Sequence, residues 1–189
     1  MNMTKNDKFY VGLVLLPLLL LFASCQKSAE ENADRQRIEQ LHQLDELLNA
    51  QSPQAMKEIE KGMQQAGDSL AFYEYYVRKG RWFCQSATPD STVGYIDRTI
   101  RFALYQPETP RRNGILAYAY NCQGINYHNF HRKADEVVSL YRSAYAYSMR
   151  SDVQHLAPSI CANLGDAYLF KNQLSEAASW YRRALFLVD

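Results

Sequence analysis

The chain has 189 residues, of which 47% are hydrophobic and 22% charged, and its formal net charge is +1. A charge this close to zero argues against a nucleic-acid partner, because that function needs a basic surface. The sequence holds 14 tyrosines but only 8 glycines and 6 prolines, which favours packed helices over an all-β fold. We therefore expect one all-α domain of ordinary size.

The amino terminus carries an apolar segment that ends beside a cysteine. Lys5 and Lys8 precede an apolar run over residues 9–23, which is shorter than the roughly 20 residues of a membrane-spanning helix. Small residues then stand directly before Cys25. This pattern resembles the lipobox of bacterial lipoproteins, which implies that residues 1–24 are a signal peptide and that Cys25 is lipidated. An ordinary signal peptide cut nearby and an uncleaved anchor remain the alternatives.

Residues 25–33 are polar and acidic without apolar periodicity, so we expect a flexible tether there and a folded domain over residues 34–189. Apolar residues at helical spacing and local cap signals predict eight helices in this domain. The clearest break lies at residues 106–113, where Thr109 can cap a helix that begins at Pro110. The expected helices, in chain order, are 34–50, one opening at Pro53, 70–85, one capped by Asp90 or Ser91, 110–129, 133–150, one capped by Ser151 or Asp152, and one starting near Leu174.

Two successive helices near the carboxyl end carry a regular alternation of small and large residues. Gly165 and Ala177 would let the two helices approach closely, while Tyr168 and Tyr181 would fill the space beside the contact. The residues of this pattern are Leu164, Gly165 and Tyr168 on the first helix, and Ala177, Tyr181 and Ala184 on the second. The pattern recurs at Gly124, Tyr127, Val137, Tyr141 and Ala144, and in weaker form at Gly80, Phe83, Thr92, Ile96 and Thr99.

This alternation resembles the signature of the tetratricopeptide repeat. The resemblance implies an all-α fold in which about four antiparallel helix hairpins form a right-handed superhelical stack, with the last hairpin a candidate for truncation. It also implies that the first helix of each hairpin lines a concave groove for a protein or peptide partner. The groove residues expected by this resemblance are Arg81, Cys84, Tyr118, Asn121, Ile125, His128, Asn129, Asp166, Leu169 and Phe170. The lysine–asparagine clamp that some members of the family use to hold a peptide carboxylate is absent.

The sequence offers little support for catalysis or for a bound metal. It contains no metalloprotease, nucleophile-elbow or glycine-rich phosphate-loop motif. His128 and His131 lie three residues apart, but no carboxylate or cysteine stands at a matching spacing, and a stable metal site usually needs three or four ligands. Cys84, Cys122 and Cys161 are expected to be small, buried and inert. We therefore expect neither enzymatic activity nor a cofactor.

We interpret the chain as a lipid-anchored scaffold of the bacterial cell envelope, facing the periplasm or the cell surface, that binds another protein. Two rivals remain open: the sensory repeat portion of a larger envelope signalling or transcription-regulating protein, and, by analogy, an accessory part of an outer-membrane nutrient-uptake system. The last expected helix, from about residue 174, is apolar on more than one side. We expect this face to continue into a longer repeat protein or to be covered by self-association.

Overall fold

The computed structural model describes residues 5–85, 89–131 and 133–188. Within these ranges, the side chains that are not described are those of residues 5–26, 85, 89–91 and 131. All regular secondary structure in the described residues is helical. The boundary between two compact units of the chain falls between Gln40 and Leu41. The fold class expected from the sequence, all-α, is therefore confirmed.

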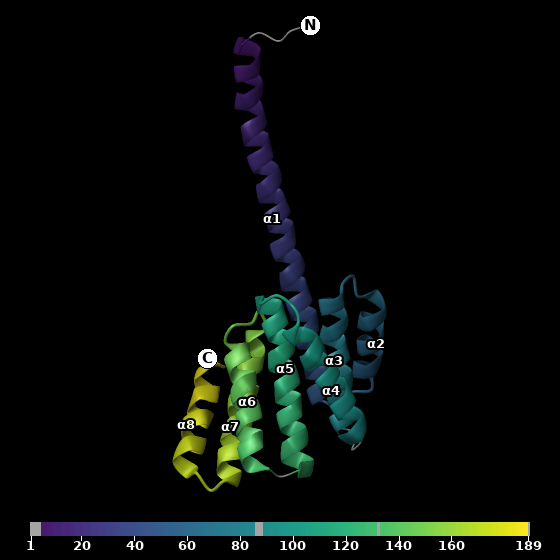
Figure 1. The fold of residues 1–189 in the computed structure, drawn as a ribbon, viewed down its shortest axis with the longest axis vertical. Helices are drawn as coiled ribbons and strands as arrows, with labels where there is room; N and C mark the ends of the chain where they lie inside the picture. The colour runs from purple at the N-terminus through teal and green to yellow at the C-terminus, as the bar shows by residue number, and fades with distance from the viewer. Residues whose placement is uncertain (1–4, 86–88, 132, 189) are drawn as a thin grey trace. The chain divides into compact units, whose positions relative to one another are not determined.

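The described residues contain eight α-helices, the number expected from the apolar periodicity (Figure 1). A π-helical turn, η1, directly follows α5, and a short 3₁₀ turn, η2, precedes α7. The elements are α1 (Lys5–Asn49), α2 (Gln54–Gln65), α3 (Ser69–Gln85), α4 (Pro89–Leu104), α5 (Pro110–Asn126), η1 (Tyr127–His131), α6 (Ala134–Ser148), η2 (Gln154–Leu156), α7 (Ala157–Phe170) and α8 (Leu174–Phe186).

Helix α5 begins where the sequence predicts. The Thr109 side chain accepts a hydrogen bond from the backbone N–H of Arg112 at 3.1 Å, and Pro110 occupies the first turn. This hydroxyl satisfies one of the backbone donors that a helix start leaves without an intrahelical partner. Asp68 caps α3 in the same way, because its Oδ1 accepts a hydrogen bond from the N–H of Ala71 at 2.7 Å.

The expected start of the seventh helix is wrong. Ser151 does not cap α7; its hydroxyl donates to the carbonyl of Ser148 at 2.8 Å and accepts from the N–H of Val153 at 3.2 Å. The turn η2 then follows, and α7 begins only at Ala157. Val153 and Leu156 are buried, so tertiary packing of this connection outweighs the local cap signal. Helix α4 begins at Pro89, and the side chains of its expected caps, Asp90 and Ser91, lie outside the described residues.

The segment over residues 26–33, expected to be an irregular tether, is helical and belongs to α1. Its side chains from residue 27 onward are exposed. Good helix formers dominate the segment, and Lys27 and Glu31 form an i,i+4 ion pair at 3.9 Å. The stretch therefore lacks the apolar periodicity that predicts a packed helix, but its residues still favour helical backbone.

Two helices end in a left-handed residue that is not glycine. Gln51 has a φ of 51° and Asn172 a φ of 58°. In each case the next residue closes the turn: the N–H of Ser52 bonds the carbonyl of Leu47, and that of Gln173 bonds the carbonyl of Tyr168. This is a Schellman-type ending, and it turns the chain sharply into the following helix.

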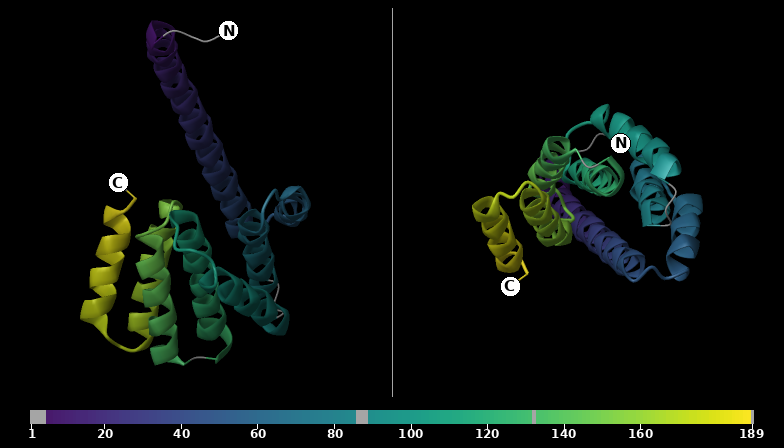
Figure 2. Two further views of the ribbon diagram at one scale, coloured as in Figure 1. Left: turned by 45° about the horizontal axis from the view of Figure 1, so that its top comes forward. Right: turned by 90° about the horizontal axis from the view of Figure 1, so that it is seen from below.

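Helices that follow one another in the chain pack together from α2 to α8, and α3 also packs against α5. Both views of Figure 2 show α5, α6, α7 and α8 beside one another. In the described residues, three apolar clusters belong to the core. The first joins α1, α2 and α3, the second joins α3, α4 and α5, and the third joins α5 to α8. Their buried members are Leu44, Leu48, Ala55 and Ile59; Ala103, Ile115 and Leu116; and Val137, Val138, Tyr141, Leu164, Ala167, Tyr168 and Ala177.

Glycines of the repeated pattern lie directly beneath tyrosines. A Cβ atom on Gly124 would lie 2.5 Å from Cε1 of Tyr141, and a Cβ atom on Gly165 would clash with the ring of Tyr181 in the same way. Gly80 lies against Tyr95, whose Cβ would be 2.8 Å away. The remaining pattern residues pack around these contacts. Thr92, Ile96, Thr99, Ala144, Leu164, Tyr168 and Ala177 are buried, whereas Phe83, Tyr127 and Ala184 are partly buried.

Candidate binding site

An open depression of about 460 Å³ lies between the carboxyl-terminal ends of α5 and α7. It takes residues from α5 and η1 on one side and from α7 on the other, with one tyrosine from α6. The residues that line it are Ile125, His128, Asn129, Tyr141, Asn163, Asp166, Leu169 and Phe170. Six of these eight belong to the expected groove, so the structure brings together the expected residues of two successive first helices.

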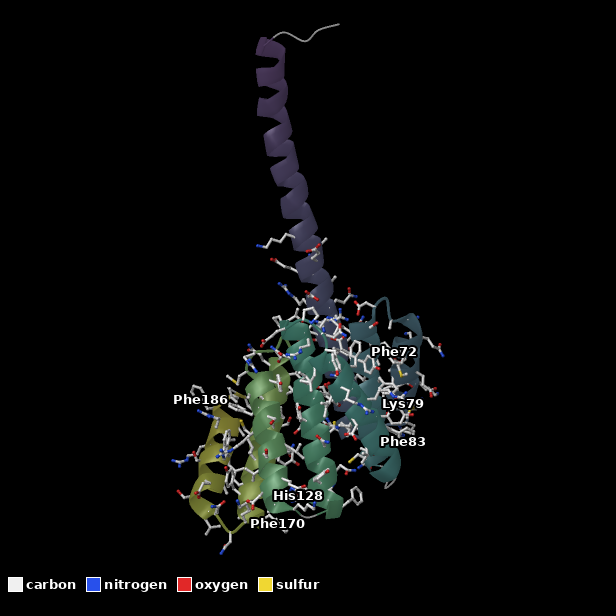
Figure 3. All side chains as sticks on the ribbon, viewed as in Figure 1. Phe72, Lys79, Phe83, His128, Phe170 and Phe186 are labelled. Carbon is white, nitrogen blue, oxygen red and sulfur yellow. The ribbon has the colours of Figure 1, made fainter. Side chains whose placement is uncertain are left out.

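The depression has an apolar end. Leu169 and Phe170, adjacent residues at the end of α7, are 50% and 52% exposed. The Phe170 ring lies 5.8 Å from the imidazole of His128, centroid to centroid. Figure 3 shows the two side chains at the same end of their helices. This end therefore presents aromatic and aliphatic surface to solvent.

The other end of the depression is polar. Asn163 donates to the side-chain oxygen of Asn121 at 2.9 Å, and Asp166 accepts from the hydroxyl of Tyr181 at 2.5 Å. The hydrogen bond to Asp166 raises the pKa of Tyr181 to about 12. Asp166 is exposed and is the one carboxylate that lines the depression, whose lining holds no lysine or arginine.

The local backbone explains why a depression forms at this point. The turn η1 carries His128 and Asn129, and its π-helical hydrogen bonding places one more residue in the turn than an α-helix would. Beneath it, Tyr141 is 2% exposed and packs against Gly124, where a side chain would collide with the ring. The floor is therefore fixed by a buried tyrosine, while the walls come from two helix ends.

The other four expected groove residues do not line an open surface. Cys84, Tyr118 and Asn121 are buried, and Arg81 is partly buried. Arg81 donates to the hydroxyl of Tyr118 at 3.3 Å and to the side chain of Asn49 in α1. The last turns of α1 thus cover this part of the expected groove, an arrangement that the repeat resemblance did not predict.

A buried ion pair fixes the end of α1 at this place. Arg78 donates through Nε and Nη2 to Asp45, at 2.9 and 2.7 Å, and the two side chains are only 3% and 5% exposed. His155 of η2 also contacts Asp45, at 3.2 Å. Burial by itself would raise the pKa of Asp45, but the charge of Arg78 and hydrogen bonds from His155, Arg78 and Tyr118 lower it to about 2.

Sequence analysis missed Asp45, Arg78 and Asn163. Asp45 lies four residues after Leu41 and three before Leu48, so it shares the apolar face of α1. A carboxylate within an apolar stripe signals a buried charge that needs a partner, but nothing in the spacing identifies Arg78 as that partner. Asn163 lies three residues before Asp166, on the same face of α7.

The cysteines are free thiols in the described residues. Burial raises the pKa of Cys122 to about 12 and that of Cys161 to about 11, and it also raises the pKa of Cys84. Thiols with raised pKa values are weak nucleophiles at neutral pH. No group of three or more His, Cys, Asp and Glu side chains that could hold a metal ion occurs among the described residues. The side chain of His131 is not described.

The predictions of a signal peptide over residues 1–24 and of lipidation at Cys25 concern residues whose side chains the structure does not describe. Residues 1–4 are not described, and neither is the side chain of Cys25, so the signal peptide and the lipidation site stay predictions. Searching the described residues finds no helix with the length and apolar character required to cross a bilayer. Leu185 and Phe186 at the end of α8, and Val188 beyond it, are exposed.

Comparisons with known proteins add no further identification. No protein-family model matches the chain, no curated protein matches it, and no solved structure matches it.

Proposed function

We propose that this protein is a binding module that holds a peptide segment of a partner protein in the depression between α5 and α7. The observation that carries the proposal is the convergence of six expected groove residues in one open concavity of about 460 Å³. That volume falls within the range of about 300–1,000 Å³ typical of ligand sites. The combination of exposed apolar surface with convergent amide groups suits a peptide, which offers both side-chain anchors and main-chain hydrogen bonds.

The lining favours binding over catalysis. Among the residues that line the depression there is no serine, threonine, cysteine or lysine that could act as a nucleophile. Asn129 and Asn163 can each donate and accept hydrogen bonds, and Phe170 and Leu169 supply an apolar anchor site. Such a set recognises shape and hydrogen-bonding pattern.

We further propose that the hairpins form a right-handed superhelical stack of the tetratricopeptide type. The repeated glycine–tyrosine contacts support this, since Gly124 with Tyr141 and Gly165 with Tyr181 occupy matching places in successive hairpins. In the proposed arrangement the concave face is shared between the last turns of α1 and the depression.

For the cellular setting, we propose a lipid anchor at Cys25 in the bacterial envelope. The support is the apolar run that ends in small residues before this cysteine. Changing Cys25 to Ser should release the protein from the membrane fraction or leave an unprocessed precursor. Unchanged fractionation and migration would contradict the lipid anchor.

The test of the binding function uses selection from a displayed random-peptide library on immobilised protein. We expect selected peptides to lose affinity for Phe170→Ser by at least about tenfold, because the variant removes an apolar anchor site. Met149→Ser is the matched control, since Met149 is also 50% exposed but does not line the depression. Peptides that bind Phe170→Ser and wild type equally would contradict the proposal.

A further inference from the structure

We propose that the depression selects a peptide segment in which a basic side chain lies close to an apolar one. This inference rests on the proposed function and adds the chemistry of the partner. Its starting point is the position of Asp166 between Asn163 and Phe170 on one face of α7. This surface therefore offers a partner one ionic contact, at Asp166, and one apolar contact, at Phe170, at a fixed separation.

No lysine or arginine that the structure describes lines the depression beside Asp166. Asp166 accepts a hydrogen bond from the Tyr181 hydroxyl, which is neutral and leaves the second carboxylate oxygen for another donor. Two of the nearby cations, Lys171 directly after α7 and Arg142 on α6, have partners within the chain. Lys171 contacts Asp135 at 2.5 Å, and Arg142 donates to the hydroxyl of Tyr168 at 2.6 Å.

Among the described residues, no cation lines the depression to meet an acidic partner. The arginines of α3 and α5 are engaged elsewhere, and none of them lines the depression. Arg78 pairs with Asp45 at 2.7 Å, and Arg111 pairs with Glu74 at 2.9 Å and with Asp68 at 3.0 Å. A negative segment would therefore be repelled by Asp166 without compensation, whereas a lysine or arginine would find a charge-assisted hydrogen bond.

The spacing on α7 sets the spacing in the partner. Asp166 and Phe170 are four residues apart, which corresponds to about 6 Å along the helix axis. Alternate side chains of an extended segment, or side chains four apart on a helix, have a similar separation of about 6–7 Å. We therefore expect the basic and apolar residues of the partner to lie within about four positions of each other.

The test extends the library selection with charge-reversal variants of the full chain. Wild-type protein should enrich peptides with lysine or arginine near leucine or an aromatic residue. Asp166→Lys should weaken those peptides by at least about tenfold and should enrich acidic residues in their place. Glu60→Lys on α2 is the control, because it makes the same charge change at an exposed residue outside the depression. Circular dichroism checks that each variant is folded.

The outcomes separate this inference from the binding function. If selected peptides lose affinity for Phe170→Ser but show no basic enrichment, or bind Asp166→Lys as tightly as wild type, the inference is overturned while the binding function stands. If the peptides are indifferent to Phe170→Ser, the binding function fails and the inference fails with it. Reversal of peptide charge on Asp166→Lys, with no reversal on Glu60→Lys, supports both.

Discussion

The buried region around Tyr118 and the open depression, which both contain residues of the expected groove, have opposite chemistry. The buried cluster, defined here as Asp45, Arg78 and Tyr118, is filled by the last turns of α1, and its charges satisfy one another. The depression is open, and its carboxylate, Asp166, is exposed and accepts a hydrogen bond from a neutral hydroxyl. The difference teaches that a position in a repeat does not determine its role. Whether neighbouring chain covers the position decides between stability and recognition.

The largest effect is expected at the buried cluster. Asp45→Ala should lower the free energy of unfolding by about 3–5 kcal/mol, because it leaves the Arg78 guanidinium buried without its carboxylate. Asp135→Ala removes half of an exposed ion pair and should cost less than about 1 kcal/mol. Urea unfolding followed by circular dichroism measures both variants. Equal losses would show that the end of α1 is held by something other than this pair.

Lowering the pH should destabilise the protein through the buried cluster, because Asp45 becomes protonated. The folded-state pKa of Asp45 is about 2, below the ordinary value of 3.8. The ionised carboxylate therefore contributes fully to the free energy of unfolding above about pH 4, and this contribution is lost as the pH falls through about 2. Between about pH 5 and pH 2, wild type should lose about 2 kcal/mol more than Asp45→Asn, which cannot titrate at this position. Unfolding curves recorded over this pH range test the difference. Parallel pH profiles for the two proteins would contradict it.

A smaller effect separates the two glycine–tyrosine contacts. Gly124→Ala should cost about 1–3 kcal/mol, because the buried ring of Tyr141 cannot move aside. Gly165→Ala should cost less, since Tyr181 is partly exposed and its ring can shift outward. Gly94→Ala has open space and should instead stabilise α4 by about 0.5–1 kcal/mol. Thermal unfolding of the three variants gives the order, and a larger loss at Gly165 than at Gly124 would reverse the argument.

The smallest effect on stability is expected in the depression. Phe170→Ser should change the free energy of unfolding by less than about 1 kcal/mol, because the side chain is already half exposed, while it lowers peptide affinity. The same unfolding assay and a binding titration on one preparation measure both quantities. A large loss of stability would place Phe170 in the core and remove it from recognition.

The sequence predicts the local features of this molecule better than the long-range ones. Helix α5 was predicted with its cap because Thr109 and Pro110 are adjacent and act locally. The start of α7 was missed because burial of Val153 and Leu156 depends on contacts that spacing does not reveal. The length of α1 was missed because residues 26–33 have helix propensity but no apolar face.

The candidate site was predictable only in part. Ile125, His128 and Phe170 came from the repeat resemblance, which carries information about which helix faces meet. Periodicity in one helix cannot show which other helix lies opposite. The pair of Asp45 and Arg78 is separated by 33 residues, and no local pattern connects them. The covering of Arg81 and Tyr118 by α1 therefore required the structure.

The π-helical turn η1 determines how the chain would respond to the deletion of a single residue. A π-helical turn holds one residue more than an α-helical turn of the same role, so a single-residue deletion within Tyr127–His131 could be absorbed by regular α-helix. In a regular α-helix, by contrast, a single-residue deletion would rotate every later side chain by about 100° around the helix axis. A deletion at Tyr127 or His128 would shift Asn129 within the turn and on the wall of the depression, while Ile125, upstream, would stay in place. Recognition at this place is thus coupled to one surplus residue in the backbone, and that residue is dispensable for the helix itself.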